Sequence, residues 1–271
     1  MSATITASMV NELRSKTGQG MMECKKALTE TGGDVDKAID YFRKKGVKTS
    51  ITERAANEGR LYAESTSDRK TAAIVVVNCN TDFTAKSEPV TQILKTATAA
   101  LLKNPSANVA EDATVRTEVT NVAQKTGENV QIGRTAVLRN PEGTVGTYVY
   151  QINSKIGVLM SVTGSPSDEV FKQLGGHIAF AKPLGMTRDA VPADLVAKER
   201  EIAIDQAKQT GKPQQIAEKI AEGKLNSFFA ERVLLDQEFF NPAVFKGSVQ
   251  NYLKQNGVTL VKYERLEVGQ Q

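Results

Sequence analysis

The stretch TAAIVVVN at residues 71–78 decides the fold, because its β-branched and apolar residues predict a strand. Residues 60–65 before it alternate between polar and apolar, and the intervening 66–69 has the composition of a turn. A similar apolar run, KIGVLMSVT at 155–163, begins about 80 residues later, counted from Ile74 to Ile156. The offset indicates an internal repeat.

The elements around the two runs support the repeat. Residues 130–139 and 145–151 predict further strands on either side of a turn at 140–143, and 168–180 predicts a helix after the second apolar run. Strand, turn, strand and helix therefore occur twice. We expect an α+β protein with two related halves, each with helices on one face of antiparallel strands.

The first 50 residues predict a small three-helix bundle. Its first helix begins at Thr6 or Ser8, either of which could be the N-cap. Glycines end the helices, and Asp34 is the expected N-cap of the third.

Two charged helical segments, 192–209 and a second one through Phe228, predict an αα-hairpin joined at 211–213. Their charge indicates that the hairpin projects into solvent or binds a partner. A helix at 248–255 and a strand at 258–268, which we expect to complete the second sheet, follow. The expected domains are a bundle (1–50), a linker (51–59), the first half (60–139), the start of the second half (140–186), the hairpin (187–230) and the end of the second half (231–271).

Composition excludes most catalytic chemistry. The chain has one histidine, two cysteines and no tryptophan. The histidine and the cysteines are too few ligands for a typical His/Cys metal site. A net charge of +4 is too weak to indicate nucleic-acid binding, and no apolar run is long enough for a membrane span. The N-terminal stretch lacks the apolar core of a signal peptide. We therefore expect a cytoplasmic protein without metal or cofactor.

Two motifs could carry function. Met21 and Met22 follow a Gly-x-Gly turn, and they either fill the bundle core or present one side chain to a partner. The segment NCNTDFTAK at 78–86 lies between a strand and a helix. In the simpler interpretation Asp82 caps the helix and Phe83 packs underneath. In the alternative, Phe83 points outward from a rigid loop as an apolar wedge.

Six segments of the chain occur in the order GMMECKKAL, VNCNTDFTAK, TGENVQIGR, KIGVL, HIAFAKP and QTGKPQQIAEKIAEGKL. In sequence and in order they resemble bacterial elongation factor Ts, the guanine nucleotide exchange factor for elongation factor Tu in translation. The match runs from about Ile5 to Val268. It implies a ubiquitin-associated-like bundle at the N-terminus and no covalent chemistry. It also implies that the chain binds elongation factor Tu–GDP, promotes GDP release, and stays bound until GTP enters.

The resemblance also implies roles for individual residues. Leu13, Met21 and Met22 match positions that contact the partner's G domain. Thr81, Asp82, Phe83 and Thr84 match the motif whose Phe inserts near the partner's Mg²⁺ and phosphate site. Thr126, Gly127 and Tyr150 match positions near the phosphate-binding loop, although Thr126 stands where Ile is common and Tyr150 where His is common. In some members the hairpin supports dimerisation, so a homodimer is a second expected assembly.

Competing interpretations rest on few residues. His177 and Cys24 are the candidates for an enzyme, but both lie among apolar residues and lack an acid/base companion at a recognisable spacing. Lys44, Lys45 and Lys48 could contact nucleic acid, but acidic residues are interspersed throughout. No Walker-type glycine loop is present, so the chain itself is not expected to bind nucleotide.

Overall fold

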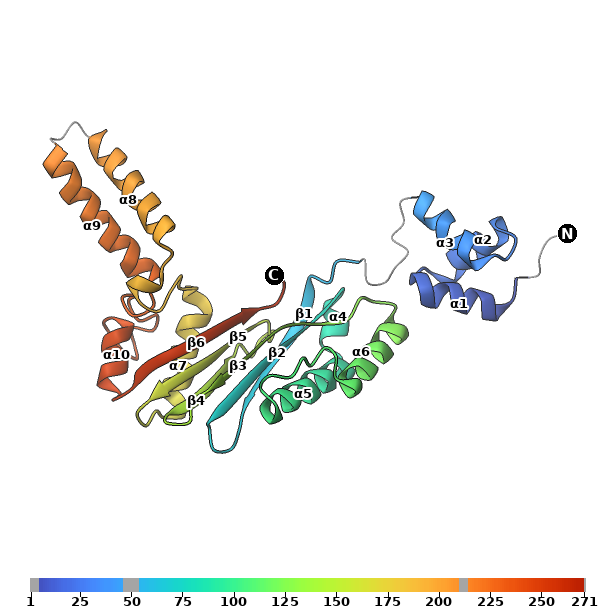
Figure 1. Cartoon of the computed structure of the whole chain (residues 1–271), viewed down its shortest axis with the longest axis horizontal. Coiled ribbons are helices and arrows are strands. Elements are labelled where there is room, and N and C mark those ends of the chain that lie inside the picture. Colours follow the sequence, from blue (N-terminus) through green and yellow to red (C-terminus); the bar gives the residue numbers. More distant parts are fainter. Residues whose placement is uncertain (1–4, 46–53, 210–213, 271) are drawn as a thin grey trace.

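The computed structural model describes residues 5–45, 54–209 and 214–270. About 49% of the chain is helix and 21% strand, which confirms the predicted α+β class. The three-helix bundle lies at one end of an elongated molecule, two sheets form the centre, and a helical hairpin extends from the other end (Figure 1).

The N-terminal bundle consists of α1 (Ala7–Thr17), α2 (Met21–Glu30) and α3 (Val35–Lys44). Thr6 is the N-cap of α1, since its hydroxyl accepts the Met9 N–H, and Asp34 caps α3 as predicted. The predicted stop of α3 at Gly46 lies outside the described residues. The buried core of the bundle comprises Val10, Leu13, Cys24, Ala27, Leu28, Ala38 and Phe42.

The first sheet has the order β1 (Glu58–Ser65), β2 (Thr71–Cys79), β3 (Gln131–Arg139), with all neighbours antiparallel. Helices α5 (Glu88–Lys103) and α6 (Ala113–Thr126) pack on its outer face.

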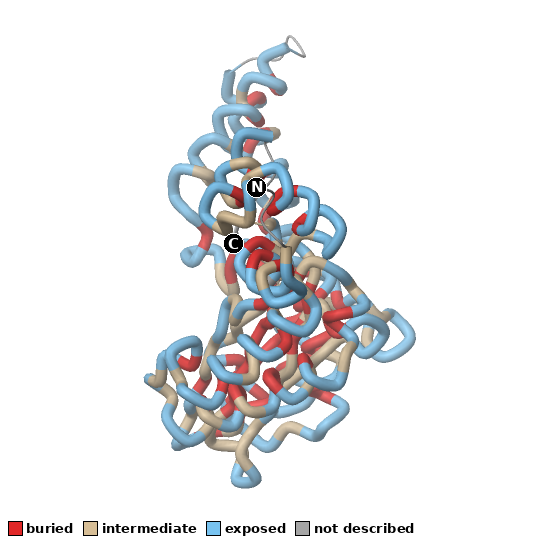
Figure 2. Tube along the Cα trace, turned by 90° about the vertical axis from the view of Figure 1, so that its right-hand side faces the viewer, coloured by how far each residue is buried: buried red, intermediate tan, exposed pale blue. Residues whose placement is uncertain are grey.

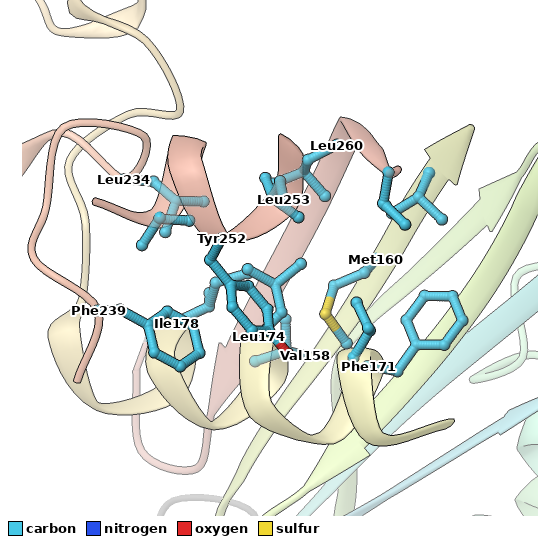
Figure 3. Close-up of a cluster of buried hydrophobic side chains, with 14 of the residues drawn as sticks. Val158, Met160, Phe171, Leu174, Ile178, Leu234, Phe239, Tyr252, Leu253 and Leu260 are labelled. Atoms are coloured by element: carbon cyan, nitrogen blue, oxygen red, sulfur yellow. The ribbon is translucent and has the colours of Figure 1, made fainter. Parts of the chain in front are cut away.

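The second sheet repeats this arrangement. Its order is β4 (Thr144–Val149), β5 (Ile156–Thr163), β6 (Thr259–Glu267), which confirms that the last strand completes the second sheet. Helices α7 (Asp168–Ala181) and α10 (Val249–Gln255) enclose a core with β5 and β6, in which Leu174, Met160 and Tyr252 converge (Figure 3).

The two sheets pack against each other, so the central strands are covered on both faces. On β2, Ala73, Val75 and Val77 face α5 and α6, whereas Ala72, Ile74 and Val76 join a cluster shared with the second sheet. This is why the run AAIVVV at 72–77 is continuously apolar rather than alternating. The contact is close at Gly157, where an added Cβ would lie 2.6 Å from Ile74 Cδ1.

The turn at 140–143 joins the sheets instead of closing a hairpin. Its flanking strands do not pair with each other, because β3 pairs with β2 and β4 with β5. Asn140 explains the crossing, because its side-chain amide donates to the β5 carbonyl of Val162 at 3.0 Å while its Oδ1 accepts the Gly143 N–H at 2.8 Å. The predicted strand 145–151 also ends earlier, at Val149.

The hairpin of α8 (Ala193–Lys208) and α9 (Gln214–Arg232) follows the short 3-10 turn Arg188–Ala190. The predicted joint at 211–213 lies outside the described residues. Much of the hairpin trace is exposed, whereas the buried stretches gather around the sheets (Figure 2). Small residues such as Ala203 and Ala221 are buried where the two helices face each other. Among the described residues, no helix is both long and apolar enough to cross a membrane.

Candidate partner-binding surface

Phe83 is the most exposed aromatic side chain of the described residues, with 85% of its surface accessible. It lies on the single-turn helix α4 (Asp82–Ala85) directly after β2. The simpler sequence interpretation, in which Phe83 packs underneath the loop, is therefore wrong. An exposed aromatic on a short turn anchored to a buried strand is suited to contact with another protein.

The cap of α4 also differs from the expectation. Thr81, not Asp82, is the N-cap, and its hydroxyl accepts the Thr84 N–H at 3.3 Å. Asp82 is the first helical residue and its carboxylate binds the Lys86 ammonium at 2.8 Å. The hydrogen bond and charge of Lys86 lower the pKa of Asp82, so the carboxylate is ionised at neutral pH.

Glu128 fixes the loop that carries Phe83, and sequence reasoning assigned it no role. Its Oε2 accepts the backbone N–H groups of Asn80 and Thr81, each at 3.1 Å. Its Oε1 accepts the hydroxyls of Thr81 and Thr84, each at 2.7 Å. One carboxylate thus receives four hydrogen bonds from residues on both sides of Phe83.

The strand end beneath the loop is buried. Cys79 has no accessible surface and its thiol donates to the Thr81 carbonyl at 3.1 Å. Burial, with a smaller contribution from the nearby Glu128 charge, raises the pKa of Cys79 to about 11. The thiol is therefore neutral and contributes packing and a weak hydrogen bond rather than reactivity.

Thr126 and Gly127 lie beside this loop, because the next residue, Glu128, is hydrogen-bonded to it. Gly127 ends α6 in the left-handed conformation with φ 70°, and the Thr126 hydroxyl accepts the Glu128 N–H at 3.2 Å. The next residue, Asn129, donates its backbone N–H to the Asn80 side chain at 2.8 Å. The 126–129 turn and the Phe83 loop thus form one hydrogen-bonded unit.

Arg54 connects this unit to the bundle. Its guanidinium donates to the Gly127 carbonyl at 3.1 Å and to the Gly18 carbonyl at 2.8 Å. Gly18 begins the turn that leads to Met21 and Met22, whose side chains are 53% and 76% exposed. Both methionines are thus accessible to a partner.

Leu13 and Tyr150 are placed differently. Leu13 is completely buried in the bundle core, so the expected direct contact by its side chain is not open in this conformation. Tyr150 follows β4 in the second sheet and is half-buried, with its ring edge-on to Phe180 at 5.0 Å. It lines a cavity of about 590 Å³ with Phe171 rather than joining the Phe83 loop.

His177 has a structural role. Its Nε2 pairs with Gln237 Oε1 at 2.9 Å, and its Nδ1 accepts the Phe240 N–H at 3.1 Å. Burial lowers its pKa, against the opposing effect of the Gln237 hydrogen bond. Cys24 is likewise buried in the bundle core. Both ring nitrogens of His177 are occupied by hydrogen bonds, and the Cys24 thiol is buried. Neither residue is therefore placed as a general base or nucleophile.

Known proteins resemble the chain over almost its whole length. A family model described as elongation factor Ts matches residues 80–270. Elongation factor Ts of Methylococcus capsulatus is 39% identical over 277 residues, covering 98% of this chain and 93% of the relative. The protein of the same name from Photorhabdus laumondii is 39% identical over 270 residues, with the same coverage of both chains.

The chain belongs to the elongation factor Ts family. It is therefore a translation elongation factor of the nucleotide-exchange class, with elongation factor Tu as the partner that the family implies. The matched region includes the Phe83 loop and the 126–129 turn.

Proposed function

We propose that this protein accelerates GDP release from elongation factor Tu by placing Phe83 against the partner's Mg²⁺ and phosphate site. The observation that supports this most directly is the 85% exposure of Phe83 on a turn whose backbone is tightly held. Exposing a phenyl ring to water is unfavourable, and a partner surface that buries it recovers the hydrophobic free energy.

The mechanism needs no covalent step. Mg²⁺ bridging the phosphate oxygens is a large part of the electrostatic hold on GDP. A wedge that disturbs this coordination weakens nucleotide binding by about tenfold for each ~1.4 kcal/mol lost. Linkage requires that nucleotide weakens the binding of the factor by the same ratio. The factor therefore stays bound to the empty partner until GTP enters.

We assign the remaining residues to docking. Met21 and Met22 contact the G domain, where their flexible thioether side chains adapt to the partner surface. Thr126 and Gly127 approach the phosphate-binding loop, and Asp82 and Thr81 present Phe83. Tyr150 contributes a separate contact from the second sheet. The hairpin of α8 and α9 extends from the end of the molecule opposite the bundle, and we assign it to homodimer formation (Figure 1). The protein acts in the cytoplasm and binds no nucleotide itself.

Release of fluorescent GDP from purified elongation factor Tu tests the proposal. We expect a substoichiometric amount of this protein to accelerate release under an excess of unlabelled GDP, and added Mg²⁺ to slow the accelerated reaction. A spontaneous release rate that does not change when the protein is added would refute the exchange activity. Acceleration that is insensitive to Mg²⁺ would refute the role assigned to metal coordination.

A further inference from the structure

We propose that Glu128 is a positioning residue for Phe83, whose carboxylate holds the Asn80–Thr84 turn in the one conformation that presents the ring to the partner. This inference deepens the proposed function and rests on it. Glu128 itself is half-buried behind the loop, whereas the ring projects from it.

The ring of Phe83 cannot fix its own orientation, because most of its surface is exposed. Its direction depends on the backbone of α4, which has only four residues and is too short to be stable as an isolated helix. The hydrogen bonds that hold this turn must therefore come from elsewhere in the fold.

Glu128 accepts these hydrogen bonds. Thr81 precedes Phe83 and donates to Glu128 through both its backbone N–H and its hydroxyl, and Thr84 follows Phe83 and donates through its hydroxyl. These hydrogen bonds to the residues before and after Phe83 restrict the rotation of the whole turn. Hydrogen bonds to an ionised acceptor are about twice as strong as neutral ones.

The chemistry requires a carboxylate of this length. Both oxygens act only as acceptors, and each receives two donors. A glutamine has one acceptor oxygen, and its amide would direct N–H groups toward the backbone donors of Asn80 and Thr81. An aspartate is one methylene shorter and does not span the same gap. Glu128 is in turn held from behind by the Thr126 hydroxyl.

The absence of tryptophan from the sequence allows a direct test without the partner. The Phe83→Trp variant introduces a single fluorescent indole at the exposed position. We expect the time-resolved fluorescence anisotropy of this indole in the free protein to show a limited amplitude of fast rotation, because the backbone on either side of position 83 is held. Adding Glu128→Ala should increase the amplitude of fast rotation at least about twofold, with Glu128→Gln intermediate since it keeps hydroxyl contacts. Glu142→Ala, on the exposed turn between the sheets, is the matched control. Anisotropy that Glu128→Ala leaves unchanged would overturn the positioning role.

Exchange kinetics then test whether positioning matters for function. We expect Glu128→Ala to slow GDP release to the level of Phe83→Ala, and the double variant to lie within about twofold of either single variant, because both changes remove one effect. Additive losses, or a global fall in melting temperature that accounts for the loss, would overturn the assignment. If the wild-type protein itself fails to accelerate release, the proposed function fails, while the anisotropy result still decides whether Glu128 orders the loop.

Discussion

Glu128 and Thr81 are 47 positions apart in the chain, yet the Thr81 hydroxyl donates to the Glu128 carboxylate at 2.7 Å and the Thr81 N–H does so at 3.1 Å. This pair joins the end of β2 to the turn after α6. Arg54 donates both to this turn, at the Gly127 carbonyl, and to the bundle, at the Gly18 carbonyl. Hydrogen bonds therefore connect the loop of the exposed Phe83 to the turn before the exposed methionines.

The methionine pair should act in docking rather than in nucleotide release. Replacing Met21 and Met22 together with alanine should raise the Kd for elongation factor Tu by about tenfold or more, as two exposed apolar contacts are lost. Release at saturating factor should stay near wild type. Titration calorimetry checks the affinity. An unchanged Kd would show that these side chains do not touch the partner.

Leu13→Ala serves as a contrasting variant in the same bundle. Leu13 is fully buried, so its truncation should destabilise the bundle by about 2–5 kcal/mol. Chemical denaturation followed by circular dichroism measures this loss. Stability equal to wild type would contradict the buried position of Leu13.

Arg54 should couple the bundle to the Phe83 loop. Arg54→Lys keeps the positive charge but cannot donate simultaneously to the Gly18 and Gly127 carbonyls through a planar fork. We expect it to weaken complex formation about as much as Arg54→Ala, by roughly threefold to tenfold. Full retention of affinity in the lysine variant would show that charge alone suffices and that the two-carbonyl contact has no role.

Much of the fold follows from local pattern, and the site does not. The apolar run at 71–78 identified β2, which the structure confirms. The family resemblance suggested Leu13 as a direct contact, but its side chain is buried in the bundle core. The direction of Phe83 could not be read from TDFT, because its neighbours cap a single turn and the fixing group, Glu128, comes from a distant turn.

The packing of sheet against sheet was also beyond local pattern, because it needs contacts between strands far apart in the chain. Gly157→Ala tests it: an added Cβ would lie 2.6 Å from Ile74 Cδ1 and 2.7 Å from Leu61 Cδ1. We expect a loss of about 1–3 kcal/mol in the free energy of unfolding from overpacking. Urea denaturation provides the value.

Gly223→Ala is the matched control for that substitution. Within the described part of the chain, and apart from the chain neighbours of Gly223 and the nearby backbone of α9, no heavy atom lies within 4 Å of a Cβ added at Gly223. Alanine should stabilise the helix by up to about 1 kcal/mol. Equal effects of the two substitutions would contradict close contact between the sheets at Gly157.

His177 should make stability depend on pH in one direction. Burial holds its folded pKa below the ordinary 6.5, so at mildly acidic pH the unfolded chain binds a proton that the folded chain does not. The stabilisation is complete above about pH 6.5 and is lost as the pH falls from there toward the folded pKa. As the chain has one histidine, NMR titration of its ring gives the folded pKa without assignment. A folded pKa at or above 6.5 would contradict the buried, neutral ring.

The most direct test is the rate of GDP release from elongation factor Tu saturated with Phe83→Ala. Because the side chain is 85% exposed, the variant should melt at the wild-type temperature. We expect it to release GDP at least about tenfold more slowly than the wild-type protein, a loss of ~1.4 kcal/mol or more. Wild-type release from a folded, saturating Phe83→Ala variant would contradict the wedge.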